Sequence, residues 1–167
     1  MCPMLIYLVD RCTGCRTCEL ACTMVHDGFF NPNKSRIRVQ LEGVPELFTV
    51  NVCKSCGKPP CEEACPTEPK AIYRDEKAGG GMVINEEVCI KCGKCLEACP
   101  FAAISWHPVT ELPLVCDVCG GDPECAKFCA SKALIVGNKQ KLSNEKRADY
   151  SKDQIDKVKE GFMKKAA

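Results

Sequence analysis

The chain has 167 residues, of which 17 are cysteine, and its formal net charge is +1. This length suggests one domain, or two small half-domains around a shared core. The near-neutral charge gives no electrostatic basis for binding nucleic acid, and no stretch approaches the ~20 apolar residues of a membrane span. The first ten residues, MCPMLIYLVD, lack the basic start and long apolar region of a signal peptide. We therefore expect a cytoplasmic chain with reduced thiols, and not a secreted disulfide scaffold.

Short strands and cysteine-rich loops alternate along the chain. Strands are predicted at 4–10, 36–40, 47–52, 71–74, 82–85, 103–107 and 133–137. The second and third of these strands predict a hairpin, and the fourth and fifth flank a glycine-rich turn that predicts another. Short helices are expected at 18–25 and 95–100. This pattern indicates an α+β fold with irregular loops.

Sixteen of the seventeen cysteines fall into four runs with a common spacing. In each run two cysteines stand three residues apart, a third follows after a short gap, and the fourth lies four residues after the third. The runs are Cys12, Cys15, Cys18 and Cys22; Cys53, Cys56, Cys61 and Cys65; Cys89, Cys92, Cys95 and Cys99; and Cys116, Cys119, Cys125 and Cys129. Cys2 lies outside these runs and is predicted to be a free thiol.

This spacing predicts iron–sulfur clusters. Three cysteines on a tight loop can ligate three irons of one cubane, while the fourth enters a helix, points away and ligates the second cluster of a pair. A zinc ribbon would use two Cys-x2-Cys knuckles and leave half of these thiols without a role. Four runs therefore predict four [4Fe-4S] clusters in two pairs. The runs could pair with their neighbours in sequence, or an inner pair could be nested inside an outer pair.

The chain resembles the four-cluster, ferredoxin-like electron-transfer subunits of the dimethyl sulfoxide reductase and nitrate reductase type. The second run has Pro59-Pro60 before its third cysteine, the third run ends in CPFAAI, and the fourth reads CDVCGGDPECAKFC. The resemblance covers about residues 4–137. Thr23 and Ala130 follow the last cysteines of the first and fourth runs where the family pattern has proline, and no ligand position departs from cysteine.

The resemblance implies two nested bacterial-ferredoxin-like halves within a domain of residues 1–137. The outer half comprises 1–30 with 110–137, the inner half 48–109, and a hairpin insertion spans 31–52. The implied ligand sets are Cys12, Cys15, Cys18 with Cys129; Cys116, Cys119, Cys125 with Cys22; Cys53, Cys56, Cys61 with Cys99; and Cys89, Cys92, Cys95 with Cys65.

The resemblance further implies a non-catalytic subunit that passes single electrons to or from a large oxidoreductase subunit. The loop HDGFFNPNKSRIRV (26–39) is similar to that of small subunits in tungsten aldehyde oxidoreductase-type complexes, which favours a tungstopterin partner. The alternatives are a molybdopterin reductase, a hydrogenase or a carbon monoxide dehydrogenase, with a flavin or other redox subunit as a further partner. A free diffusible ferredoxin is the remaining alternative, which the net charge of +1 disfavours.

His26 and His107 are interpreted as loop histidines, and Phe29, Phe30 and Trp106 as cluster-shielding or interface aromatics.

The segment 138–167 contains no cysteine and is rich in charge. Ser151 and Gln154 predict a helix start of the capping-box type. Ile155, Val158, Phe162 and Met163 follow at helical spacing. We expect a helical tail that packs on its own domain or the large subunit, or that bridges protomers in a larger assembly.

Overall fold

The computed structural model describes residues 4–43, 47–76, 79–137, 143–144, 147–148 and 151. Cys2, part of each hairpin turn and most of the C-terminal tail lie outside these residues. The chain divides into two units, Met1–Val136 and Gly137–Ala167, which are described separately. No helix within the described ranges is long and apolar enough to cross a membrane.

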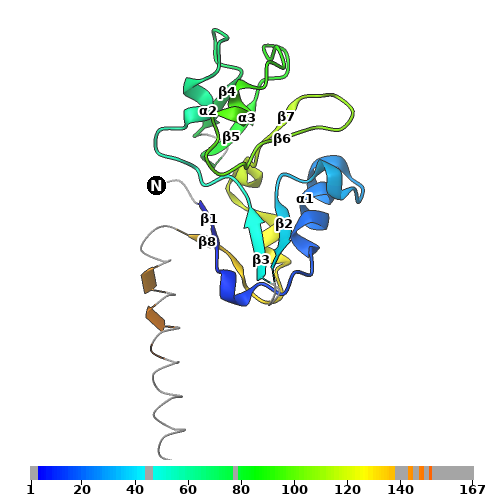
Figure 1. The fold of residues 1–167 in the computed structure, drawn as a ribbon, viewed down its shortest axis with the longest axis vertical. Helices are drawn as coiled ribbons and strands as arrows, with labels where there is room; N and C mark the ends of the chain where they lie inside the picture. Colours follow the sequence, from blue (N-terminus) through cyan, green and yellow to red (C-terminus); the bar gives the residue numbers. More distant parts are fainter. Residues whose placement is uncertain are drawn as a thin grey trace, which may run out of the picture. The chain divides into compact units, whose positions relative to one another are not determined.

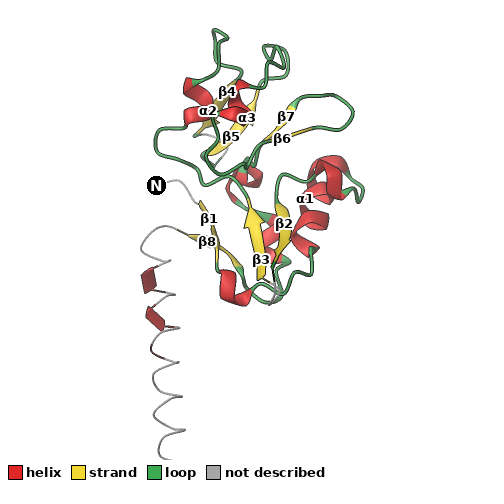
Figure 2. Cartoon of the chain, viewed as in Figure 1, coloured by secondary structure: helices red, strands yellow, loops and turns green. Residues whose placement is uncertain are grey.

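The first unit is built from short elements joined by longer loops, as Figure 2 shows. The strands are β1 (Met4–Tyr7), β2 (Arg38–Glu42), β3 (Leu47–Asn51), β4 (Ile72–Asp75), β5 (Gly81–Ile84), β6 (Ser105–Trp106), β7 (Pro113–Leu114) and β8 (Leu134–Gly137). The α-helices are α1 (Thr17–Asp27), α2 (Pro60–Glu63), α3 (Lys94–Glu97) and α4 (Glu124–Lys127). The 3-10 helices are η1 (Val9–Arg11), η2 (Pro32–Lys34) and η3 (Val118–Gly121). This confirms an α+β fold with few helices.

The described strands form two-stranded pairs and no larger sheet. β2 and β3 are antiparallel, with Val39 opposite Val50, and β4 and β5 are antiparallel, with Tyr73 opposite Val83. Both hairpins were predicted from alternation and turn residues. β6 pairs with β7, and β1 pairs with β8 from the other end of the unit, as Figure 1 shows. The β1–β8 pair brings the beginning of the chain next to the segment that follows the fourth cysteine run.

The buried residues form two hydrophobic clusters, and cysteines contribute to both. The first contains Leu5, Ile37 and Val52 together with Cys18, Cys22, Cys116, Cys125 and Cys129. The second contains Ile72 and Met82 together with Cys61, Cys65 and Cys95. The helices pack in the same two groups: α1 contacts α4, and α2 contacts α3. The first and fourth runs therefore lie together, as do the second and third.

α1 and the following loop are held together by specific hydrogen bonds. The helix ends at Gly28, whose φ of +73° is the left-handed conformation that glycine adopts readily. The buried Glu19 carboxylate accepts the backbone N–H of Val39 at 2.7 Å, and the Thr23 hydroxyl accepts that of Asn31 at 3.3 Å. These bonds position residues 28–39 against α1.

In the second unit, the described residues 143–144, 147–148 and 151 are helical. The predicted helix start at Ser151 is wrong, because Ser151 is itself helical and its hydroxyl donates to the Arg147 carbonyl at 2.9 Å. A serine hydroxyl in a helix interior commonly bonds back to the carbonyl four residues earlier. Gln154 and the predicted apolar positions 155, 158, 162 and 163 lie outside the described residues.

Candidate iron–sulfur sites

The four cysteine loops share a backbone conformation. In each run the residue before the second cysteine has a positive φ: Gly14 at +68°, Ser55 at +47°, Lys91 at +55° and Val118 at +58°. Left-handed residues of this kind turn successive backbone N–H groups towards one concave face, which binds anions. The loops are therefore suited to surround an anionic cluster, and three of the four use a side-chain-bearing residue to do so.

Three cavities in the first unit are each lined by four cysteines. They are Cys12, Cys15, Cys18 and Cys129; Cys53, Cys56, Cys61 and Cys99; and Cys65, Cys89, Cys92 and Cys95. In each cavity three cysteines belong to one run and the fourth to another. The empty space, open solvent included, is about 340, 350 and 330 Å³ respectively. The three cavities thus have the same donor set, and four thiolates suit a [4Fe-4S] cubane.

The remaining cysteines, Cys22, Cys116, Cys119 and Cys125, also lie near one another. Cys22, Cys116 and Cys125 belong to the same buried cluster. Burial, and after it the neighbouring Cys22 and Cys119, raises the pKa of the Cys125 thiol to about 12. Here again three cysteines come from one run and the fourth from another. All sixteen described run cysteines are free of disulfide bonds.

Burial raises the thiol pKa of the third cysteine of every run. It raises the thiol pKa to about 12 for Cys18 and Cys125 and to about 11 for Cys61 and Cys95. Such thiols stay protonated at neutral pH unless a positive charge stabilises the thiolate. Bound iron would provide that charge, so loading these sites would release protons and add the binding free energy to folding.

The fourth cysteine of every run has a hydrogen-bonding partner at its sulfur. Two of these partners are backbone groups: Cys22 Sγ accepts the N–H of Arg36 at 3.3 Å, and Cys99 Sγ accepts the N–H of Ala103 at 3.5 Å. The other two are hydroxyls: Thr67 Oγ1 lies 3.2 Å from Cys65 Sγ, and Ser131 Oγ lies 3.7 Å from Cys129 Sγ. Donors at a ligand sulfur stabilise negative charge and thereby tune the potential of an iron–sulfur cluster. The hydroxyls two residues after Cys65 and Cys129 are visible in the sequence, but their role was not recognised there.

The interpretation of His26 as a loop residue is wrong, because His26 lies in the last turn of α1. Its Nε2 lies 3.4 Å from Asp117 Oδ1 and 3.8 Å from Cys119 Sγ. Burial lowers the pKa of His26, but the hydrogen bonds to Asp117 and Cys119 outweigh it and raise the pKa to about 9. The three side chains lie close enough to hold a metal ion. Because Cys119 belongs to a cysteine run, we interpret His26 as a donor to a cluster ligand.

His107 behaves as the sequence predicted. Its Nδ1 accepts the backbone N–H groups of Val109 and Thr110, at 3.2 and 3.0 Å, and so closes the β6–β7 turn.

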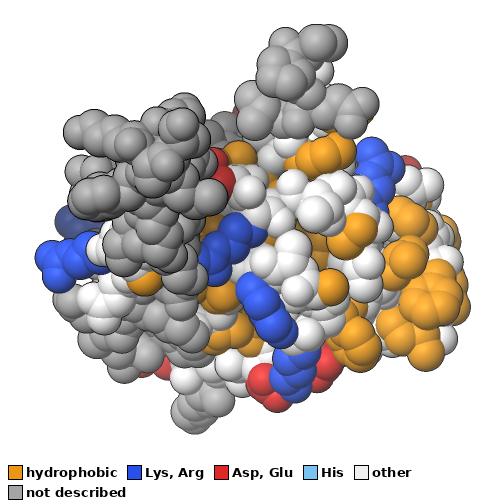
Figure 3. Space-filling model, turned by 90° about the horizontal axis from the view of Figure 1, so that it is seen from below, with side chains coloured by type: hydrophobic (Ala, Val, Ile, Leu, Met, Phe, Trp, Pro, Cys, Tyr) orange, Lys and Arg blue, Asp and Glu red, His pale blue; other side chains and the backbone are white. Residues whose placement is uncertain are grey.

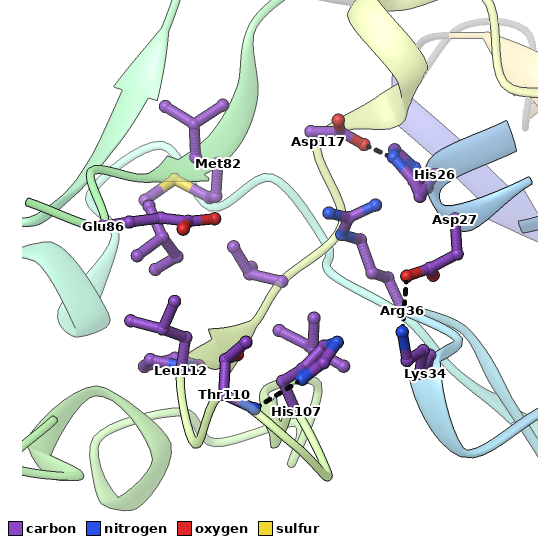
Figure 4. A pocket seen from close by; sticks show the side chains of 15 residues that line it. His26, Asp27, Lys34, Arg36, Met82, Glu86, His107, Thr110, Leu112 and Asp117 are labelled. Atoms are coloured by element: carbon purple, nitrogen blue, oxygen red, sulfur yellow. Dashed lines mark hydrogen bonds and ion pairs between the residues drawn. The ribbon is translucent and has the colours of Figure 1, made fainter. Parts of the chain in front are cut away.

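His26, Arg36, His107 and Asp117 line a larger cavity, with about 970 Å³ of empty space when open solvent is likewise included, which Figure 4 shows. Lys34 pairs with Asp27 at 3.0 Å on its rim. Basic and acidic side chains both line this cavity, so its lining alone does not select the charge of a ligand.

Several aromatic side chains predicted to shield clusters or form interfaces are exposed. Phe29, Phe30 and Trp106 are 49%, 66% and 41% exposed. Figure 3 shows apolar side chains gathered at one edge of the face seen from below. Such exposure disfavours the shielding interpretation and suits contacts with another protein.

Residues 44–139 match the family of the 4Fe-4S dicluster domain, and residues 9–25 match a 4Fe-4S binding domain. The chain belongs to the 4Fe-4S dicluster family. Iron–sulfur binding is the chemistry that this family has and that the cysteine-lined cavities fit. The chain is 35% identical over 158 residues to the polyferredoxin-like subunit of aliphatic sulfonate oxidoreductase from Pyrococcus furiosus, covering 92% of this chain and 89% of that protein.

A second relative is the electron transport protein HydN of Escherichia coli, 31% identical over 167 residues, with 83% of this chain and 91% of that protein covered. Among solved structures, a chain of the BamBC complex of benzoyl coenzyme A reductase is 26% identical, covers 81% of this chain and 75% of its own, and gives a TM-score of 0.47. By its family and curated relatives, this dicluster protein is an iron–sulfur electron-transfer subunit of the kind found in oxidoreductase complexes.

Proposed function

We propose that the chain carries four [4Fe-4S] clusters and relays single electrons between the active-site subunit of an oxidoreductase complex and a further acceptor. The observation that supports this most is the set of three cavities that are each lined by three cysteines of one run and one of another. When bound, each cubane accepts and returns one electron at a time. The chain contributes the thiolates, the donors to their sulfurs and the exclusion of water.

The proposed ligand sets are crossed and nested. They are Cys12, Cys15, Cys18 with Cys129; Cys116, Cys119, Cys125 with Cys22; Cys53, Cys56, Cys61 with Cys99; and Cys89, Cys92, Cys95 with Cys65. The β1–β8 pair and the α1–α4 contact support an outer half of 1–30 with 110–137, and the α2–α3 contact supports an inner half of 48–109. The insertion 31–52 adds β2 and β3, whose Val39 and Val50 belong to the core around the outer cysteines.

The sites are proposed to follow one another in a line. Within the outer half, Cys18 is one of the neighbours that raise the pKa of Cys125 after burial. Between the halves, Cys53 packs against both hydrophobic clusters and raises the pKa of Cys116, again after burial. Cys15 and Cys92, from the two ends of this line, are the exposed members of the sixteen described cysteines. Electrons would therefore enter and leave near these two residues.

The partner is proposed to be a large tungstopterin subunit of the aldehyde oxidoreductase type, in the cytoplasm. The loop 26–39 supports this choice. The near full-length similarity to a subunit of aliphatic sulfonate oxidoreductase supports an oxidoreductase partner in general. The competing outcomes are a molybdopterin reductase, a hydrogenase, a carbon monoxide dehydrogenase, or no fixed partner at all. A flavin or other redox subunit is proposed as the acceptor.

Anaerobic purification of the tagged chain from its own cells tests these proposals. We expect a large co-purifying subunit, tungsten in the same fraction, and about four irons and four sulfides per cubane-binding run. Nickel or molybdenum in place of tungsten would reassign the partner. Iron without any partner would leave a free ferredoxin.

The charged tail is proposed to reach a neighbouring protomer. Deletion of residues 143–167 should then lower the mass of the complex in light scattering while its iron content is unchanged. An unchanged mass would refute this bridging role.

A further inference from the structure

We propose that Arg36 is the counter-charge of the cluster held by Cys22, Cys116, Cys119 and Cys125, and that it raises the reduction potential of that cluster. This inference rests on the proposed cluster assignment. Arg36 is two residues before β2 and outside every cysteine run, within the loop 26–39.

The backbone of Arg36 is fixed beside the cluster ligands. Its N–H donates to Cys22 Sγ at 3.3 Å. The preceding Ser35 is fully buried, and its hydroxyl donates to the Ile37 carbonyl at 2.7 Å. Together with the hydrogen bonds from α1 to Asn31 and Val39, these contacts leave the segment little freedom.

The guanidinium group points towards the same ligands and is incompletely paired. Figure 4 shows it extending towards Asp117 and His26. Burial raises the pKa of Cys22, and the backbone N–H and the charge of Arg36 offset only part of this rise. Nη1 is buried without a hydrogen-bond partner. Among the residues that the structure describes, no carboxylate lies within ion-pair distance of Arg36.

Arg36 is half-buried, and its buried Nη1 has no hydrogen-bond partner, which is costly for a cation unless a negative charge lies nearby. Asp117 does not supply this negative charge, because its Oδ1 already contacts His26 Nε2 and accepts the backbone N–H of Cys119. A cubane with four thiolates is anionic, and reduction adds one electron and one more negative charge without breaking a bond. Arg36 therefore stabilises the reduced form more than the oxidised form. Its charge is permanent, so the effect needs no proton uptake.

Arg38 offers a matched control on the same segment. Its guanidinium donates to the carbonyls of Pro32 and Asn33, so it has partners that do not include a cysteine. Arg36→Gln and Arg38→Gln remove the same charge from neighbouring positions. Arg36→Lys keeps the charge at the first position.

The test is an anaerobic redox titration of the loaded protein with dithionite, followed by electron paramagnetic resonance of each reduced cluster. Iron and sulfide analysis comes first, because a wild-type protein without four cubanes would refute the proposed function and not the role of Arg36. We expect Arg36→Gln to lower the reduction equilibrium constant of one cluster about tenfold, or ~59 mV for a one-electron couple. Arg36→Lys should restore most of this shift, and Arg38→Gln should cause little.

The affected signal must also be the one altered by Cys22→Ser, which changes one ligand of this cluster alone. An unchanged potential in Arg36→Gln, an equal shift of all clusters, or a shift in a cluster that Cys22→Ser leaves unaltered would overturn the proposal. If Arg36→Gln loses this cluster, retention of it in Arg36→Lys would support a requirement for the charge. Loss of the cluster in Arg36→Lys as well would overturn it.

Discussion

Gly81 of β5 lies so close to Asp117 that a Cβ on the glycine would come within 2.1 Å of the Asp117 backbone oxygen. β5 packs directly against η3, the turn that contains Cys119. The β4–β5 hairpin therefore supports the fourth cysteine loop by backbone contact.

Gly81→Ala should consequently destabilise the loaded protein by ~1–3 kcal/mol, because the backbone on both sides must move. The midpoint of thermal unfolding, measured anaerobically, would report this. Gly57→Ala is the matched control, since a Cβ at Gly57 meets nothing within 4 Å. Equal midpoints for the two variants would contradict the packing argument.

Cysteine substitutions test the crossed ligand sets. Cys99→Ser and Cys56→Ser should alter the same electron paramagnetic resonance signal, because both residues line one cavity. Cys92→Ser, from the same run as Cys99, should alter a different signal. The crossed assignment fails if Cys99→Ser and Cys92→Ser affect one common cluster.

The hydroxyl of Thr67 should tune the cluster at Cys65. Thr67 Oγ1 lies 3.2 Å from Cys65 Sγ and also accepts the Ala71 N–H at 2.9 Å. Thr67→Val should lower the reduction equilibrium constant of this cluster ~2–10-fold, the worth of one hydrogen bond. Thr67→Ser keeps the hydroxyl and should titrate like the wild type, and a Val variant with an unaltered potential would exclude the effect.

Cluster removal should unfold the first unit. Cysteines contribute to both hydrophobic clusters, so the apolar core is sparse without the metal sites. After anaerobic chelation we expect loss of the cooperative thermal transition in circular dichroism, and its return with iron and sulfide. An apoprotein that keeps the transition of the loaded protein would show that the polypeptide core suffices.

The sequence by itself determined the local structure of this protein. Cysteine spacing predicted the iron–sulfur chemistry, and alternation with turn residues predicted the β2–β3 and β4–β5 hairpins, because each depends on residues close in the chain. The predicted helix start at Ser151 was wrong, because Ser151 is itself helical and its hydroxyl donates to the Arg147 carbonyl.

Only the tertiary structure decided which runs lie together and which residues outside them meet the ligands. The spacing of Cys22 is the same whether its sulfur faces a neighbouring run or a distant one. The β1–β8 pair and the α1–α4 contact bring it to Cys125. The packing of α1 and the loop after it likewise brings His26 to Cys119 and Arg36 to Cys22. These are contacts between residues far apart in the chain, which no local pattern encodes.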